Sequence, residues 1–130
     1  MTTALVVDAE PQSVAMLRIA LTDIGFRAVA SPDGRLPGGW EAPGLVVVGP
    51  TAQPSPAEAL RLVAETPLTA QAVIVVVIGP GSDLDEATAC AMGASASVPM
   101  PSTGADLLIA LHSHVQQALL SPWKTQTEVH

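Results

Sequence analysis

Two acidic side chains, Asp8 and Glu10, directly follow the short aliphatic run Ala4–Val7. Mg²⁺ is typically held by carboxylates together with phosphate, and Asp8, with Ala9 next to it, would be a poor anchor for that ion. Asp8 and Glu10 could act as a general acid and base. Because no nucleophile or oxyanion-stabilising group stands near them in the sequence, catalysis by this pair has little support.

Three other groups of residues suggest chemistry but have simpler interpretations. Residues 79–82 (GPGS) are glycine-rich before an expected helix, yet they lack the lysine of a phosphate-binding loop, and Pro80 has no amide hydrogen to donate. His112 and His114 stand two residues apart on an expected helix and therefore face away from each other, which prevents shared metal binding. Cys90 is expected to be a small buried hydrophobic residue rather than a reactive thiol.

The elements that must position these residues follow from alternating apolar runs and helix-like segments. Proline or glycine stands at almost every third position of residues 35–44, so no regular helix is expected there. The alternation predicts a flavodoxin-like, doubly wound parallel sheet of strand order 2-1-3-4-5, with helices on both faces and the second helix short or missing. Strands are expected at 4–7, 27–30, 45–48, 73–78 and 96–98. Helices are expected up to Ile24, where Gly25 closes the first one, at 57–65, from Ser82 or Asp83 to Met92, and at about 103–120.

Size, charge and cysteine content restrict the class of protein. A chain of 130 residues has room for one domain, expected over residues 1–121, with 122–130 as a tail or the start of a linker. The net charge of −7 disfavours binding to nucleic acid or anionic lipid. The longest apolar run, Val73–Ile78, is far shorter than the roughly 20 residues of a membrane span. With a single cysteine and no secretory signal at the start, we expect a cytoplasmic location.

The order and spacing of these segments resemble the receiver domain of bacterial response regulators over roughly residues 3–120. The resemblance implies an acid pair after the first strand, a phosphoacceptor aspartate after the third and a Ser or Thr after the fourth. It also implies an aromatic residue in the fifth strand and a lysine before a cis-proline. The matching segments are LVVDAEP at Leu5–Pro11, GLVVVGP at Gly44–Pro50, VIVVVIG at Val73–Gly79 and MGASASVPMP at Met92–Pro101.

When the site positions of that family are transferred one by one to this sequence, the residues of its phosphorylation site are missing. No Asp or Glu occurs anywhere from residue 42 to residue 57, and Lys124 is the chain's only lysine. The resemblance therefore indicates a degenerate, aspartate-less pseudo-receiver. The acid pair falls on Asp8 and Ala9 with Glu10 beside them, the phosphoacceptor on Gly49, the hydroxyl on Ile78, the aromatic on Ser97 and the lysine on Met100, while Pro101 keeps the proline.

The replaced residues leave two main interpretations of the pocket. Gly49, Ile78 and Met100 are small or apolar where the family has charged or polar groups, so the cleft could pack shut around the flexible Met100 side chain. Alternatively, a small apolar or mixed ligand could bind beside Asp8 at the carboxyl ends of the strands. We expect no metal and no cofactor.

An uncharged stretch suggests an interaction surface. Residues 87–105 contain no Asp, Glu, Lys or Arg. In the receiver family this helix 4–strand 5–helix 5 face commonly mediates dimerisation or output contacts, which implies a homodimer or a protein partner here. The alternative is that the stretch is buried or inert. The candidate face consists of Ala91, Met92, Ala94, Ser95, Ser97 and Val98.

These observations favour a phosphorylation-independent protein-interaction or dimerisation module of signal transduction or transcriptional regulation, not an enzyme. The alternative function is a sensor that binds a small molecule in the degenerate strand-end pocket.

Overall fold

The computed structural model describes residues 3–36, 42–99, 109, 112 and 113. Within them, five parallel strands form one sheet in the order β2-β1-β3-β4-β5. The predicted flavodoxin-like order is therefore confirmed, and each strand lies within one residue of its expected bounds. The strands are β1 (Thr3–Val7), β2 (Arg27–Ser31), β3 (Leu45–Val48), β4 (Val73–Ile78) and β5 (Ala96–Pro99).

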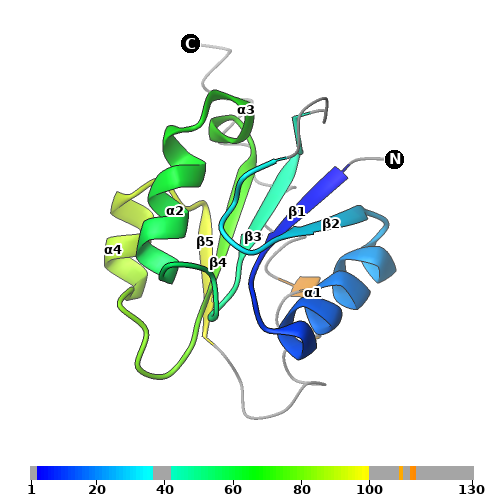
Figure 1. The fold of residues 1–130 in the computed structure, drawn as a ribbon, viewed down its shortest axis with the longest axis horizontal. Coiled ribbons are helices and arrows are strands. Elements are labelled where there is room, and N and C mark those ends of the chain that lie inside the picture. Colours follow the sequence, from blue (N-terminus) through cyan, green and yellow to red (C-terminus); the bar gives the residue numbers. More distant parts are fainter. Residues whose placement is uncertain (1–2, 37–41, 100–108, 110–111, 114–130) are drawn as a thin grey trace.

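Helices cover both faces of this sheet, as Figure 1 shows. The helix α1 packs on one face, whereas α2, α3 and α4 lie on the other. Residues 109, 112 and 113 are helical, as predicted, while the rest of the expected last helix lies outside the described residues. The helices are α1 (Pro11–Ile24), α2 (Pro56–Glu65), α3 (Pro67–Ala70) and α4 (Glu86–Ala91).

Local sequence explains where the first two long helices begin and end. A proline at the first position starts both α1 and α2, since its missing N–H is not needed there. The Ser55 hydroxyl oxygen accepts a hydrogen bond from Glu58 N at 3.2 Å and caps α2. Gly25 ends α1 in a left-handed conformation with φ of 111°, as the sequence predicted.

The start of α4 differs from the prediction. The helix begins at Glu86 rather than at Ser82 or Asp83, because those two side chains have other partners. Ser82 Oγ accepts from Leu84 N at 3.1 Å, and Asp83 Oδ1 accepts from Ala57 N at 3.2 Å. Asp85 caps the helix instead, accepting from Thr88 N at 2.7 Å.

The core consists of two clusters, one on each face of the sheet, because successive strand residues point to opposite sides. Val47 and Val75 face the α1 side, whereas Val46 and Val76 face the α2 side. Five of the six residues of β4 are buried, as expected for an interior strand covered on both faces.

Between β2 and β3 the described residues contain no helix, in agreement with the proline and glycine pattern, and 37–41 lie outside the description. None of the helices in the described ranges has the length and apolar character needed to cross a membrane.

Candidate functional site

The carboxyl ends of β1 and β3 lie side by side, and Asp8 and Gly49 follow them directly. Ligands of open parallel sheets bind outside such strand ends, at the point where the strand order reverses. Asp8 is nevertheless only 2% exposed. The Asp8 carboxylate of the predicted pocket is therefore closed to solvent.

Four hydrogen bonds satisfy the Asp8 carboxylate within the protein. Its Oδ1 accepts from Ala9 N at 3.2 Å, from Thr51 N at 2.9 Å and from the Thr51 hydroxyl. Its Oδ2 accepts from the Ser13 hydroxyl. Glu10 N in turn donates to Thr51 Oγ1 at 3.1 Å. A buried carboxylate is costly unless donors of this kind surround it, so here the protein itself takes the place of a counter-cation.

Gly49 lacks a side chain because Asp8 occupies the space that one would need. A Cβ built on Gly49 would lie 2.5 Å from Asp8 Cγ and 3.0 Å from Asp8 Cβ, well inside normal contact distance. The φ of Gly49 is not positive, so its backbone conformation suits any residue. The need for glycine is therefore steric, and it comes from the neighbouring strand.

The structure brings together only part of the predicted pocket. Ala9 is half-buried and Glu10 is exposed, and Glu10 joins the network through its backbone N–H. Ile78 is half-buried and packs against the α2-side core, while Ser97 is half-buried within β5. Met100 and Pro101 lie outside the described residues, so the expectation that Met100 fills the cleft is left as a prediction.

Ser13 and Thr51 are the site residues that the sequence interpretation missed. Ser13 lies in the first turn of α1 and is buried, and Thr51 lies two residues beyond Gly49. The available signal was a hydroxyl residue shortly after each of two strands that should be neighbours. Such residues are common in loops, which is why the pattern alone does not single them out.

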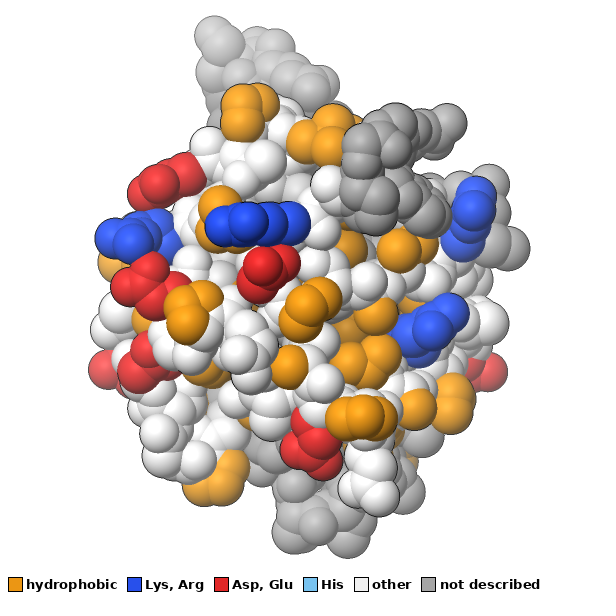
Figure 2. Space-filling model, viewed as in Figure 1, with side chains coloured by type: hydrophobic (Ala, Val, Ile, Leu, Met, Phe, Trp, Pro, Cys, Tyr) orange, Lys and Arg blue, Asp and Glu red, His pale blue; other side chains and the backbone are white. Residues whose placement is uncertain are grey.

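Among the described residues no cluster suits a metal ion, and two arginines form ion pairs with nearby acids. No group of three or more His, Cys, Asp or Glu side chains among them could ligate a metal. Arg61 pairs with Glu58 at 2.6 Å and Arg35 with Asp33 at 3.6 Å. Figure 2 shows such acidic and basic side chains next to one another over the α2 side of the molecule. Both pairs are solvent-exposed, so each adds little to stability.

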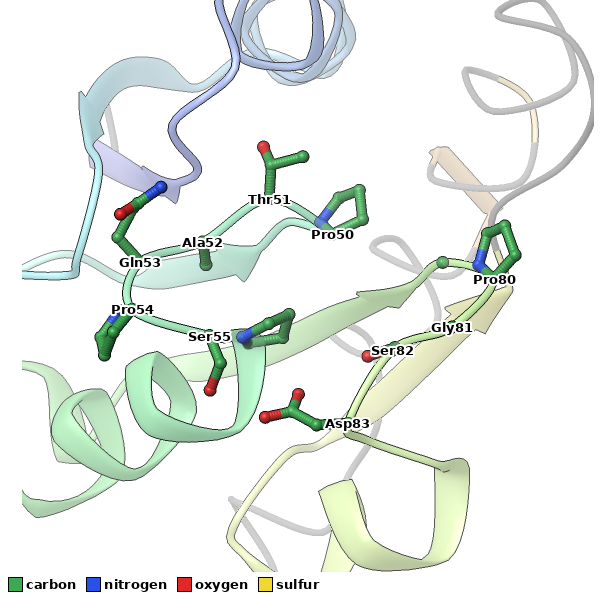
Figure 3. A pocket seen from close by; sticks show the side chains of 12 residues that line it. Pro50, Thr51, Ala52, Gln53, Pro54, Ser55, Pro80, Gly81, Ser82 and Asp83 are labelled. Atoms are coloured by element: carbon green, nitrogen blue, oxygen red, sulfur yellow. The ribbon is translucent and has the colours of Figure 1, made fainter.

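A proline-lined groove of about 550 Å³ lies beside the closed pocket. It separates the loop after β3 from the loop after β4, as Figure 3 shows. Asp83 reaches across toward the start of α2, while the Thr51 side chain points away from the groove toward Asp8. The lining residues are Pro50, Thr51, Ala52, Gln53, Pro54, Ser55, Pro56, Gly79, Pro80, Gly81, Ser82 and Asp83.

The candidate interaction face is smaller than the sequence suggested. Val98 and Ala94 are buried in the core, so neither contributes to the surface. Ala91 is exposed, and Met92, Ser95 and Ser97 are half-buried. Cys90 is exposed, contrary to the expectation of burial. The α4–β5 face is therefore defined here by the exposed, uncharged residues Ala87, Thr88, Cys90, Ala91, Gly93 and Pro99.

Cys90 is exposed because the buried position of this short helix is Ala89. Ala89 alone of the α4 residues is fully covered, and it packs against the α2-side core. The next residue on a helix is rotated by about 100° and points away from that core. An Ala-rich sequence does not show which of its small residues faces inward.

No protein-family profile matches this sequence, and no curated protein is significantly similar to it. The fold, however, is similar to solved response-regulator structures. The phosphorylated cyanobacterial phytochrome response regulator RcpA superposes with a TM-score of 0.72 at 12% identity, over 92% of this chain and 95% of that chain. A response regulator receiver domain protein from Clostridium thermocellum gives 0.67 at 20% identity, over 92% and 98% of the two chains.

A third similar structure is a longer protein. NtrX from Brucella abortus, solved in complex with ADP, has a TM-score of 0.65 at 18% identity and is matched over 97% of this chain but 29% of its own length. At these identities the comparisons establish the receiver fold.

Proposed function

We propose that this chain is an atypical response-regulator receiver domain that lacks the phosphoacceptor aspartate and acts as a phosphorylation-independent interaction or dimerisation module. Its role would lie in signal transduction or transcriptional regulation, without enzymatic activity. The observation that carries the proposal is the pairing of Gly49 with Asp8. The position after β3 has no side chain, and the neighbouring carboxylate is buried and fully hydrogen-bonded.

The chemistry of aspartyl phosphorylation explains why this pairing matters. The reaction needs a carboxylate nucleophile, a divalent ion on the phosphoryl oxygens and positive charge on the remaining oxygens. Gly49 offers no nucleophile, and Asp8 has no free oxygen facing solvent. At the end of β4, the side chain of Ile78 is apolar and offers no hydrogen-bond donor to a phosphoryl oxygen.

The α4–β5 face supports an interaction role through its lack of charge. Two copies of a chain with a net charge of −7 repel each other, and they can approach most easily where neither carries charge. The exposed residues of α4 that follow Glu86 carry no charge and provide such a surface, and small side chains lose little conformational entropy when they are covered.

The absence of phosphorylation is tested with acetyl phosphate and with beryllofluoride in the presence of Mg²⁺. We expect no mass increase and no spectral change of the backbone amides near Asp8. A Mg²⁺-dependent adduct on an aspartate would contradict the proposal.

The α4–β5 face is tested with a charge substitution on α4 and a matched one on α1. Ala91→Glu places a carboxylate on the proposed face, whereas Ala15→Glu places one on the exposed side of α1, across the sheet. We expect Ala91→Glu alone to weaken self-association by about tenfold or more, because each contact would bury an unpaired charge. Sedimentation equilibrium measures the effect. Equal association of both variants and the wild type would exclude this face.

A ligand-sensing role is the second candidate, and the proline-lined groove favours it. Its volume of about 550 Å³ lies within the range of small-molecule sites, and among the described residues that line it Asp83 alone is charged. A bound ligand should raise the melting temperature in a saturable way. Gln53→Trp, at an exposed lining position, should block that shift while Gln53 N keeps its hydrogen bond to Pro32 O. A shift that survives this substitution would place the ligand elsewhere.

A further inference from the structure

We propose that the space at the end of the sheet admits a side chain from position 8 or from position 49 but not from both, and that the Asp8 side chain fills this slot. Its carboxylate binds the loop after β3, through Thr51, and the start of α1, through Ser13. We call this set of hydrogen bonds the latch. The inference concerns the conformation of the strand-end loops and does not depend on any interaction partner.

The latch joins three segments, of which the loop that carries Thr51 is distant in sequence from the other two. Asp8 follows β1, Ser13 belongs to the first turn of α1, and Thr51 lies in the loop between β3 and α2. Hydroxyls and backbone N–H groups that converge on one point form the kind of cradle that binds an anion from solution. Here the anion is a side chain of the same chain, so the cradle is already occupied.

The hydrogen bonds of the latch reinforce one another. Glu10 N donates to Thr51 Oγ1, whose hydroxyl donates onward to Asp8, and Thr51 N donates to the same carboxylate oxygen at 2.9 Å. Bonds in such a chain strengthen one another, and most so at its buried end, the Asp8 carboxylate. No buried side-chain nitrogen or oxygen in the described ranges is without a partner, so removal of the carboxylate would leave the buried Ser13 hydroxyl unpaired and take the partner from the half-buried Thr51 amide and hydroxyl.

The geometry makes the two positions mutually exclusive. A Cβ at position 49 would lie 2.5 Å from Asp8 Cγ, so any larger residue there must displace the carboxylate and break its bonds. If Asp8 is first replaced by Ala, the contact with the carboxyl carbon disappears and only the 3.0 Å contact with the Cβ of residue 8 is left. A substitution of Gly49 should therefore be harmful in the presence of Asp8 and much less harmful in its absence.

The latch also fixes one wall of the proline-lined groove. Thr51 belongs to the loop that forms this wall, but its hydroxyl points to Asp8 instead of into the groove (Figure 3). The loop is therefore held in place without an external ligand. A domain built in this way keeps a single arrangement of these strand-end loops.

The experiment is a double-mutant cycle on melting temperature with wild type, Asp8→Ala, Gly49→Asp and the double variant. We expect Gly49→Asp alone to lower the melting temperature by roughly 5 °C or more. In the Asp8→Ala background the same substitution should cost much less or raise the melting temperature, since the carboxylate then enters the vacated slot. A matched control cycle uses Gly44→Asp and Asp23→Ala, both at exposed positions, and should be additive.

Amide hydrogen exchange gives a second measurement in case Gly49→Asp does not fold. The Thr51 amide should exchange about tenfold or more faster in Asp8→Ala than in the wild type, while amides in the middle of α2 should be unchanged. Equal effects of Gly49→Asp in both backgrounds, or an unchanged Thr51 amide, would overturn the latch. Neither result would bear on self-association, so failure of the latch can be distinguished from failure of the proposed function.

Discussion

Hydroxyl side chains supply hydrogen bonds that the backbone of this protein lacks. Thr69 is fully buried, and its hydroxyl donates to the carbonyl oxygen of Val63 at 2.6 Å. In a continuing helix that carbonyl would accept from the residue four positions later, which is Pro67 and has no N–H. Thr69 therefore replaces a missing backbone donor at the junction of α2 and α3.

Two variants of Thr69 test whether its hydroxyl takes the place of the missing backbone donor. Thr69→Val keeps the shape but removes the donor, and we expect it to lower the free energy of unfolding by about 1–2 kcal/mol. Thr69→Ser keeps the hydroxyl and should lose less. Urea unfolding monitored by circular dichroism measures both, and an equal loss in the two variants would show that packing, not the hydrogen bond, is responsible.

The sequence identified Asp8 as a pocket residue but not Ser13 and Thr51, the side chains that donate hydrogen bonds to it. Asp8 and Gly49 were predicted to lie in one pocket because both follow strands that are neighbours in the expected sheet. The partner Thr51 is 43 residues from Asp8, and its hydroxyl could equally have faced solvent. Steric exclusion between two backbone positions depends on distances of a few ångströms, which residue types and spacing do not report.

At the scale of elements, α4 shows how a short helix depends on the residue that caps its start. It has six residues, too few to be stable alone, and Asp85 holds its start by accepting from Thr88 N. Hydrogen bonds from the Thr88 backbone, and second from its side chain, hold the pKa of Asp85 below its ordinary value. The charged form of Asp85 is therefore the form that caps the helix.

This cap predicts a pH dependence with a definite sign. Because the folded pKa of Asp85 lies below the unfolded one, its contribution is fully present above the unfolded pKa and is lost as the pH falls through the folded pKa. The wild type should therefore lose stability relative to Asp85→Asn between about pH 5 and pH 3. Urea unfolding of both proteins at several pH values measures this difference. A difference that is constant across the range would contradict the assignment.

For α4 the sequence predicts that a helix exists but not the residue at which it begins. The existence of the helix followed from its small residues and from Gly93, but three candidate caps, Ser82, Asp83 and Asp85, stand before Glu86. Tertiary contact decides among them, since Asp83 is committed to Ala57 N at the start of α2. The choice therefore depends on an element that begins 30 residues earlier in the chain.

At the scale of the whole molecule, the sheet divides the core into two clusters with no shared members. Val47 belongs to the α1 side and Val63 to the α2 side, and both are fully buried. The strand order was predictable because parallel strands joined by helices admit few arrangements. The prolines and glycines of residues 35–44 predicted a short or missing second helix, and the described residues between β2 and β3 contain none.

A pair of substitutions tests whether the two clusters act independently. Val47→Ala and Val63→Ala should each lower the free energy of unfolding by about 1–3 kcal/mol, because each leaves a cavity in its own cluster. The double variant should lose the sum to within about 0.5 kcal/mol. Chemical denaturation measures the free energy of unfolding of all three proteins, provided that the m-value is unchanged. A clear departure from the sum would show that a cavity on one face of the sheet alters packing on the other.

The exposed thiol of Cys90 has a practical consequence. It is the only cysteine of the chain and stands next to Ala91 on the outer side of α4. A single fluorophore or spin label can therefore be attached to the native protein without mutagenesis. Quenching or dipolar broadening of that probe would then report directly when another molecule approaches this helix.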